Sequence, residues 1–252
     1  MTSDVGVPEL DGAPLFLLDV LPDTAELVVG GDEGRHAVDV LRLTTGEQVR
    51  VGDGHGTVAE GAVLSAGHEG LRIAVSARFE VPAQTPEFVL VQALPKGDRG
   101  PLAVELATEL GVDRIVPWTA ARCVTRWRDD RVARGVAKWR AAARAASKQS
   151  RRPRVPEITE PMTTREVCGL LGDTDLAVVL HERATRPLAG LDIPRNGTVA
   201  VVIGPEGGLT DGEVVAFRAA GAQAVRLGAE VLRTSTAGAA ALAALSMKTR
   251  WV

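Results

Sequence analysis

The 252-residue chain is 45% hydrophobic and 24% charged, proportions that are ordinary for a globular protein with room for one large domain or two smaller ones. Its longest apolar stretches are of strand length or are interrupted by charges, and its N-terminus lacks a basic segment followed by an apolar one, so we expect no membrane segment and no secretion. The two cysteines lack CxxC spacing and the four histidines share no metal-ligand spacing, so we expect reduced thiols, no bound metal and a cytoplasmic location.

The net charge of −3 conceals an uneven distribution of charge along the chain. Residues 114–154, the basic band, contain thirteen Lys/Arg and two Asp/Glu, a local balance of +11, which leaves sixteen basic and thirty acidic residues elsewhere. Three of the four tryptophans, Trp118, Trp127 and Trp139, lie in the same band. Such a concentration of cations favours nucleic acid as the partner, and a solvated helix face is the competing interpretation.

The first part of the chain, residues 1–82, reads as a small, mostly β domain that begins with a loose tail over residues 1–13. One helix, with apolar residues at Ala37, Val40, Leu41 and Leu43, is expected over residues 33–43. A run of short strands with one helix suggests a barrel, and Pro82 and Pro86 mark a linker. The expected strands are residues 15–20, 26–30, 48–53, 57–65 and 71–79.

From residue 83 to residue 252 the pattern changes to alternating strands and helices, which predicts an α/β domain with a mostly parallel sheet. Strands are expected at 88–94, 114–118, 176–180, 199–203 and 224–227, and helices at about 99–110, 130–148 and 163–171 and after each of the last two strands. In the 130–148 helix the apolar residues, among them Val136, Trp139 and Ala143, fall on one side, and Lys and Arg occupy the rest of the circumference.

Two glycine-rich loops near the C-terminus predict a small-molecule pocket. Each follows an aliphatic strand, and ligands of open α/β sheets bind beyond the carboxyl ends of the strands. The first loop, Gly-Pro-Glu-Gly-Gly at 204–208, carries Glu206 and no Lys, so it would repel a phosphate. Glu206 either bonds loop or helix N–H groups or faces a neutral or cationic ligand. Both alternatives suit S-adenosylmethionine, whose sulfonium is positive.

These residues resemble the SPOUT methyltransferases, and more narrowly the family of ribosomal RNA small subunit methyltransferase E, whose members methylate N3 of a uridine in 16S rRNA. The resemblance covers nearly the whole chain. It rests on Ile-Gly-Pro-Glu-Gly-Gly-Leu at 203–209 and Val-Leu-Arg-Thr-Ser-Thr-Ala at 231–237, with Leu-Gly at 227–228 and Leu-His-Glu at 180–182. Further matches are His36 with residues 40–43, residues 93–99 and 109–112, and Gln149, Ser150 and Arg152 with residues 155–158.

The resemblance implies a PUA-like RNA-binding β-barrel at residues 1–82 and a SPOUT domain with a trefoil knot at residues 83–252. It also implies a homodimer that acts on the 16S rRNA of the small ribosomal subunit. S-adenosylmethionine would be held by Leu180, His181, Glu182, Ile203, Gly204, Pro205, Glu206, Gly207, Gly208, Leu227, Gly228, Val231, Leu232, Arg233 and Thr236. RNA would be bound by Arg35, His36, Arg42, Lys96, Arg99, Arg126, Arg151, Arg152 and Arg154.

Two positions depart from the pattern of that family. Ser235 stands where the family usually has Glu, which puts an essential acid–base role for that carboxylate in doubt. We expect Ser235 or Thr234 to cap the following Ala-rich helix. Arg151 stands where the family usually has Gly, and it adds positive charge beside the expected site.

Methyl transfer to N3 of uracil requires loss of the N3 proton, and the resulting anion spreads onto O2 and O4. An arginine that donates to those oxygens would stabilise it. Arg152 is the first candidate and Arg233 the second, with phosphate anchoring as the alternative role of Arg152. Trp118 and Trp127 are candidates for stacking on a base, although packing in the core is the commoner fate of a Trp.

Three rival functions stay open at this point. A non-catalytic RNA-binding protein would explain the barrel and the basic band but not the glycine loops. A sugar-phosphate or nucleotide enzyme is disfavoured by Glu206 and the missing phosphate-loop Lys, and a serine hydrolase by the absence of a G-x-S-x-G elbow.

Overall fold

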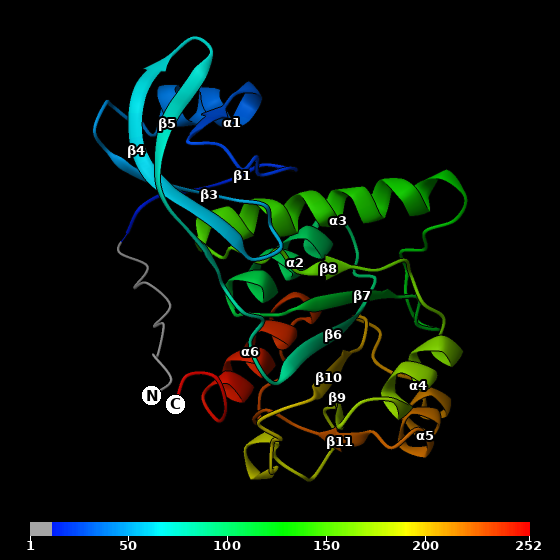
Figure 1. The fold of residues 1–252 in the computed structure, drawn as a ribbon. Helices are drawn as coiled ribbons and strands as arrows, with labels where there is room; N and C mark the ends of the chain where they lie inside the picture. Colours follow the sequence, from blue (N-terminus) through cyan, green and yellow to red (C-terminus); the bar gives the residue numbers. More distant parts are fainter. Residues whose placement is uncertain (1–11) are drawn as a thin grey trace. The chain divides into compact units, whose positions relative to one another are not determined.

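The computed structural model describes residues 12–252, in which the chain packs as two compact units (Figure 1). The N-terminal unit is Met1–Ala83 with Ser147–Val155, and the C-terminal unit is Gln84–Ala146 with Pro156–Val252. Most of the expected tail, residues 1–11, lies outside the described residues. The segment Ser147–Val155 packs with the N-terminal unit, whereas the sequence analysis assigned it to the second domain.

A five-stranded sheet forms the N-terminal unit, and all five strands expected from the sequence take part in it. In sheet order they are β1 (Leu15–Leu17), β3 (Gln48–Gly52), β4 (Thr57–Gly67), β5 (Gly70–Glu80) and β2 (Glu26–Val29). The β1–β3 pair is parallel and the other pairs are antiparallel. Phe16, Leu27, Val51, Leu71 and Ile73 are buried together and form the core of the unit.

The expected helix over residues 33–43 is replaced by two short elements. α1 (Gly31–Arg35) is followed by a π-helix, η1 (His36–Val40), in which the Leu41 N–H donates to the His36 carbonyl. The wider turn of a π-helix shifts the register of the side chains. Ala37 is therefore buried, but Val40 and Leu41 are 64% and 42% exposed, so the helical spacing read from the sequence does not describe this segment.

The segment Ser147–Val155 is joined to the N-terminal unit through backbone and side-chain bonds. The Val155 N–H donates to the Gly54 carbonyl at 2.9 Å, and Arg154 Nε donates to the Val81 carbonyl at 2.7 Å. Lys148 forms an ion pair with Glu33, and both side chains are partly buried. These contacts explain why a segment distant in the sequence belongs to this unit.

The C-terminal unit is built on a six-stranded sheet in which every pair is parallel. In sheet order the strands are β11 (Gln223–Val225), β9 (Leu176–Leu180), β10 (Thr198–Ile203), β6 (Glu87–Ala93), β7 (Arg114–Trp118) and β8 (Glu157–Ile158). The central strands are buried along almost their whole length, as expected for a parallel sheet covered on both faces. β8 has only two residues and was not predicted from the sequence.

Helices cover this sheet in pairs: α2 packs on α6, and α4 packs on α5 (Figure 1). Their bounds are α2 (Arg99–Glu109), α3 (Asp130–Gln149), α4 (Thr164–Gly172), α5 (Asp211–Ala219) and α6 (Thr234–Ser246), with a 3-10 turn η2 (Leu188–Gly190). α6 is rich in Ala and has no polar face, so it is buried on most sides. A Cβ at Gly238 would meet the side chains of Leu90 on β6 and Ile203 on β10, which shows how closely α6 approaches both strands.

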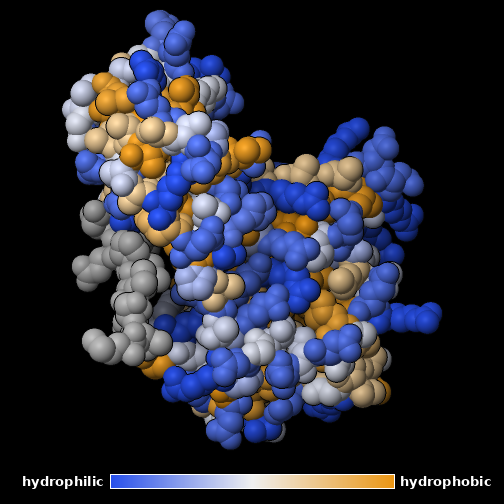
Figure 2. Space-filling view, viewed as in Figure 1, coloured by the Kyte–Doolittle hydropathy of each residue, from blue (hydrophilic) through white to orange (hydrophobic). Residues whose placement is uncertain are grey.

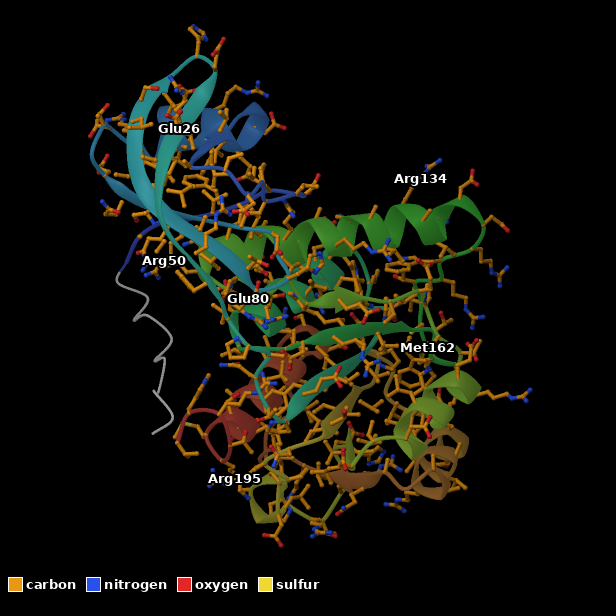
Figure 3. The ribbon with its side chains drawn as sticks, viewed as in Figure 1. Glu26, Arg50, Glu80, Arg134, Met162 and Arg195 are labelled. Atoms are coloured by element: carbon orange, nitrogen blue, oxygen red, sulfur yellow. The ribbon has the colours of Figure 1, made fainter. Side chains whose placement is uncertain are left out.

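The two sides of α3 differ as the sequence predicted. Val136, Trp139 and Ala143 are buried, whereas Arg134 is exposed and points away from the helix (Figure 3). On the face shown in Figure 2, hydrophilic residues cover most of the surface and apolar residues occur in small groups between them. Within residues 12–252, no helix has the combination of length and hydrophobicity that crossing a bilayer requires.

Candidate functional site

A cavity of about 690 Å³ lies at the carboxyl ends of β9, β10 and β11. These strands are neighbours in the sheet, in the order β11-β9-β10, so the loops that follow them meet at one edge. The three loops are residues 180–183, 203–211 and 226–234. The volume is in the range of small-molecule sites, about 300–1,000 Å³.

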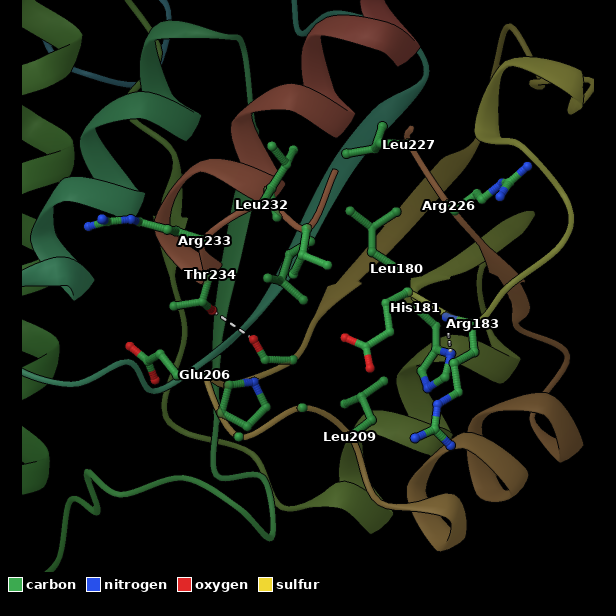
Figure 4. A pocket seen from close by; sticks show the side chains of 18 of the residues that line it. Leu180, His181, Arg183, Glu206, Leu209, Arg226, Leu227, Leu232, Arg233 and Thr234 are labelled. Carbon is green, nitrogen blue, oxygen red and sulfur yellow. Dashed lines mark hydrogen bonds between the residues drawn. The ribbon is translucent and has the colours of Figure 1, made fainter. Parts of the chain in front are cut away.

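The cavity has an apolar region and a charged rim. Leu180 from the first loop lies near Leu227 and Leu232 from the third (Figure 4). The charged residues that line the cavity are Glu182, Glu206, Asp211 and Glu230, together with Arg99, Arg122, Arg183, Arg226 and Arg233. Carboxylates and guanidinium groups are therefore interspersed around the leucines.

Glu206 holds two loops together. Its Oε1 accepts the Lys96 backbone N–H at 3.1 Å and lies 3.9 Å from the Arg99 guanidinium. This geometry matches the interpretation in which Glu206 bonds loop N–H groups. The residue also lines the cavity, so the same carboxylate contributes negative potential there.

Thr234 links the second and third loops through a buried relay. Its Oγ1 donates to the Gly204 carbonyl at 2.7 Å (Figure 4), and it accepts from Gln92 Nε2 at 3.1 Å. Gln92 is 1% exposed and Thr234 5% exposed, so neither bond competes with water. These bonds were not predicted from the sequence, although a Gln within the apolar strand β6 was a visible signal.

The N-terminus of α6 lacks the side-chain cap that was expected from the sequence. Its N-cap is Arg233, and no side chain makes a capping hydrogen bond there. The prediction that Ser235 or Thr234 caps this helix is wrong, because the Thr234 hydroxyl is directed to Gly204 instead. Ser235 is buried, at 4% exposure.

The glycine loop 204–208 is supported from the segment 119–123. Arg122 donates from Nη1 to the carbonyls of Gly207 and Leu209, both at 3.1 Å. Glu213 is buried in the first turn of α5, where it closes a capping box with Thr210 and also accepts the Ala121 N–H at 2.7 Å. The loop is thus fixed by bonds to its own helix and to a neighbouring segment.

The cysteines show no sign of a reactive thiol. Burial raises the pKa of the Cys123 thiol, and the carboxylates of Glu206 and Glu213 raise it further. Burial also raises the pKa of Cys168. Both thiols are free of disulfide bonds, and residues 12–252 contain no cluster of three or more His, Cys, Asp or Glu side chains arranged to hold a metal.

Fourteen of the fifteen predicted cofactor-binding residues line this one cavity. The exception is Thr236, which is exposed on α6 and donates only to the Arg233 carbonyl at 3.2 Å. The cavity also includes residues that the prediction omitted. They are Arg99, Arg122, Arg183, Leu209, Asp211, Arg226, Ala229, Glu230, Thr234 and Ala237.

The nine predicted RNA-binding residues are divided between the two units. Arg35, His36, Arg42, Arg151, Arg152 and Arg154 belong to the N-terminal unit, and Lys96, Arg99 and Arg126 belong to the C-terminal unit. Some of these cations already have protein partners. Arg35 pairs with Asp32, Arg154 donates to Val81, and Arg126 donates to the Ala121 carbonyl.

The two candidate catalytic arginines also belong to different units. Arg233 lines the cavity, but its guanidinium points away from Leu180 and Leu227 (Figure 4). Arg152 follows α3 in the N-terminal unit, where its backbone N–H donates to the Ser147 carbonyl at 2.7 Å and its side chain is partly exposed.

Both candidate stacking tryptophans pack within the C-terminal unit. Trp118 is fully buried and makes an edge-to-face contact with Phe217, with ring centroids 5.2 Å apart. Trp127 packs against Gly135 of α3 and makes an edge-to-face contact with Trp139, also at 5.2 Å. Packing is therefore the role that the geometry supports for each.

Comparisons with known proteins agree with this geometry. Residues 83–246 match the model of an RNA methyltransferase domain, and residues 29–76 match that of an RNA methyltransferase PUA domain. A ribosomal RNA small subunit methyltransferase E from Mycobacterium bovis is 47% identical over 245 residues, which cover 95% of this chain and 94% of the relative.

Two solved structures are similar along nearly the whole chain. One is a ribosomal RNA small subunit methyltransferase E from Neisseria gonorrhoeae bound to S-adenosylmethionine, with 27% identity, a TM-score of 0.81 and coverage of 94% of this chain and 98% of that one. The other is a methyltransferase from Legionella pneumophila in complex with the same cofactor, with 26% identity, a TM-score of 0.80 and the same coverage.

Proposed function

The chain belongs to the ribosomal RNA small subunit methyltransferase E family of rRNA methyltransferases, and from this membership we propose that it transfers a methyl group from S-adenosylmethionine to N3 of a uridine in 16S rRNA. The observation that carries the proposal is the cavity at the ends of β9, β10 and β11. Its position, its volume and its three loops suit a cofactor of this size.

The residues present fit S-adenosylmethionine. The Leu180, Leu227 and Leu232 side chains offer an apolar surface for the adenine, and the glycine-rich loops expose backbone groups to its polar edge. Glu182, Glu206, Asp211 and Glu230 place carboxylates where a sulfonium could lie, among the five arginines that also line the cavity. When bound, this cofactor supplies the electrophilic methyl group.

The protein's part in the reaction is to orient the base and to stabilise its charge. Loss of the N3 proton of uracil to solvent leaves negative charge on O2 and O4, and this charge is consumed when N3 bonds to the methyl carbon and the methyl–sulfur bond breaks. An arginine that donates to these oxygens stabilises that charge, as a preorganised donor does in an oxyanion hole. We assign this role to Arg152, with Arg233 as the second candidate. No carboxylate or histidine is assigned as a base.

The RNA would be held by the cations of the two units, from Arg35, His36, Arg42, Arg151, Arg152 and Arg154 to Lys96, Arg99 and Arg126. Phosphate contacts by Lys and Arg release counterions, so affinity for RNA should fall as salt is raised. An affinity that stayed constant between low and moderate salt would remove these residues from the interface.

Four finer features accompany this proposal. The matched PUA domain at residues 29–76 supports closure of the N-terminal sheet into an RNA-binding barrel. The sheet has the strand order β11-β9-β10-β6, and α6, which follows β11 in the chain, packs on β6 and β10. This arrangement supports threading of the C-terminal unit into a trefoil knot. We also propose a homodimer, which sedimentation of the full chain would detect, and a cytoplasmic location alongside the ribosomal subunits.

Two measurements test the proposal. Titration calorimetry with S-adenosylmethionine should give saturable binding at one site per chain, and binding that is absent would favour the non-catalytic RNA-binding alternative. Mass mapping of nucleosides in 16S rRNA from cells that lack the protein should show loss of one N3-methyluridine. If every methylated uridine persisted, the assigned reaction would be wrong even though the cofactor bound.

A further inference from the structure

A second cavity of about 600 Å³ lies beside the first in the C-terminal unit. The two cavities share Arg99 and Glu206, which therefore form a common wall. Lys96, Gly97 and Asp98, in the loop after β6, and Leu102 on α2 line the rest, together with Val124 from the segment that follows β7. None of the predicted cofactor-binding residues except Glu206 lines this second cavity.

The second cavity presents apolar side chains to solvent. Leu102 is 42% exposed and Val124 is 75% exposed, although both are aliphatic. Exposed apolar side chains that gather in a hollow, rather than standing singly, indicate a binding surface. Enzymes that act on a nucleobase hold the flipped base between aromatic or apolar side chains.

The charges around the cavity favour an anion. Asp98 is 2.6 Å from the Lys138 ammonium, which lowers the pKa of the Asp98 carboxyl and neutralises its charge. Glu206 is paired with Arg99 and with the Lys96 N–H. Among the described residues the Lys96 ammonium has no ion-pair partner, so one positive charge is left over at the cavity. Val124 itself lies between Arg122 and Arg126 in the sequence.

We propose that this second cavity binds the methyl-accepting nucleotide of the RNA, with its base against Leu102 and Val124 and its phosphate near Lys96. The proposal rests on the function proposed above, because it places the acceptor in the cavity adjoining that of the methyl donor. Arg99, in the wall between the cavities, then lies beside both ligands. A nucleoside monophosphate fits within the volume of this cavity.

A bulky side chain that fills the second cavity should block the acceptor nucleotide without affecting the binding of S-adenosylmethionine. Val124→Trp should lower kcat/KM on 30S subunits at least ten-fold and leave the Kd for S-adenosylmethionine within two-fold of wild type. Val215→Trp is the matched control, because Val215 is 65% exposed on α5 and lines neither cavity. A Val124→Trp enzyme with kcat/KM within two-fold of wild type would overturn the proposal. So would a change in oligomeric state on sedimentation, since the surface would then contact a second copy of the chain.

Photocrosslinking identifies the occupant directly. RNA that carries 4-thiouridine at successive uridine positions should crosslink to residues 96–102 or to Val124 from one position, the one that mass mapping identifies as methylated. Crosslinks confined to other residues would overturn the proposal while methylation by the wild-type enzyme continued. If the wild type methylated no RNA, the proposed function would fail, and crosslinking to this cavity would still report whether it binds a nucleotide.

Discussion

The cofactor cavity and the predicted RNA-binding residues are assembled in different ways. The cavity is formed within one unit by loops that follow three adjacent parallel strands, and backbone and buried side-chain bonds fix those loops. The cations are divided between both units and lie partly on helices and mostly in the segments between elements. A ligand of the cavity therefore meets a preorganised site, whereas RNA must be recognised by groups whose positions depend on two separate cores.

This difference predicts that single substitutions separate the two functions. A change in the segment Ser147–Val155 should affect the RNA and leave the cofactor bound, because that segment packs with the N-terminal unit. A change in the relay or the loops of the cavity should affect the cofactor first.

Arg152→Ala should lower turnover on 30S subunits about 100-fold, the effect of removing one donor from a developing oxyanion. The Kd for S-adenosylmethionine, measured by calorimetry, should stay within two-fold, because Arg152 belongs to the N-terminal unit and does not line the cavity. Arg195→Ala removes the same charge from an exposed position outside the basic band and should leave turnover unchanged (Figure 3).

Two outcomes of the Arg152→Ala experiment would contradict this prediction. Unchanged turnover in Arg152→Ala would remove this arginine from the mechanism and leave Arg233 as the candidate. A large rise in the KM for the subunit with kcat unchanged would instead identify Arg152 as a phosphate anchor, the alternative role considered from the sequence.

Glu213→Ala should destabilise the protein by about 2–3 kcal/mol, because it leaves the partly buried N–H groups of Thr210 and Ala121 without their acceptor. Glu166 closes the same type of capping box on α4, with Thr163, but its carboxyl is exposed. Glu166→Ala is therefore the matched control, and its effect in urea denaturation should be clearly smaller. Equal effects would show that the bond from Glu213 to the 119–123 segment adds no stability.

The contribution of Glu166 to the free energy of unfolding should depend on pH because of its hydrogen bonds. The backbone N–H and hydroxyl of Thr163 hold the pKa of the Glu166 carboxyl below its ordinary value of 4.5. A lowered folded-state pKa stabilises the protein above the ordinary value, and this stabilisation is lost as the pH falls below 4.5 through the folded-state pKa. The stability difference between wild type and Glu166→Ala should therefore be constant near neutral pH and diminish in acid.

The sequence predicted most of the cavity because the elements that position it are continuous. A strand such as β10 is a run of buried aliphatic residues, and its loop begins where that run ends. The Gly-Pro-Glu-Gly-Gly segment that follows β10 therefore marks the edge of the sheet at which the cavity lies. What the sequence missed depends on contacts between distant residues. Thr236 was chosen instead of Thr234 because only the packing of α6 on Gln92 decides which hydroxyl faces inward.

Other misses have the same origin. The π-helix at His36–Val40 exposes Val40 and Leu41, although their spacing with Ala37 is that of an ordinary helix. The segment Ser147–Val155 continues α3 in the sequence, and its attachment to Gly54 and Val81 is a long-range contact. Local periodicity carries no information about either.

Thr234→Val tests the relay that joins the loops of the cavity. The change keeps the shape of the side chain but deprives Gly204 of a donor and Gln92 of an acceptor, so the Kd for S-adenosylmethionine should rise about ten-fold, in line with about 1–1.5 kcal/mol for a hydrogen bond. Thr236→Val removes a hydroxyl two residues away that bonds only Arg233 on the surface, and it should leave the Kd unchanged. The reverse order would mean that Thr236 contacts the cofactor and that the sequence-based choice was correct.

Arg151→Gly concerns the backbone of the segment that carries Arg152. Arg151 adopts φ +56°, in the left-handed region that favours glycine, and it ends the turn after α3. A non-glycine residue pays about 1 kcal/mol for this conformation, so Arg151→Gly should raise the free energy of unfolding by up to that amount, reduced by the greater flexibility of Gly in the unfolded chain. Arg151→Gln removes the charge but keeps the Cβ, and it should leave stability unchanged. If both variants weakened RNA binding equally while only the glycine stabilised the fold, the charge of Arg151 would act on the RNA and its backbone conformation would be a separate cost to stability.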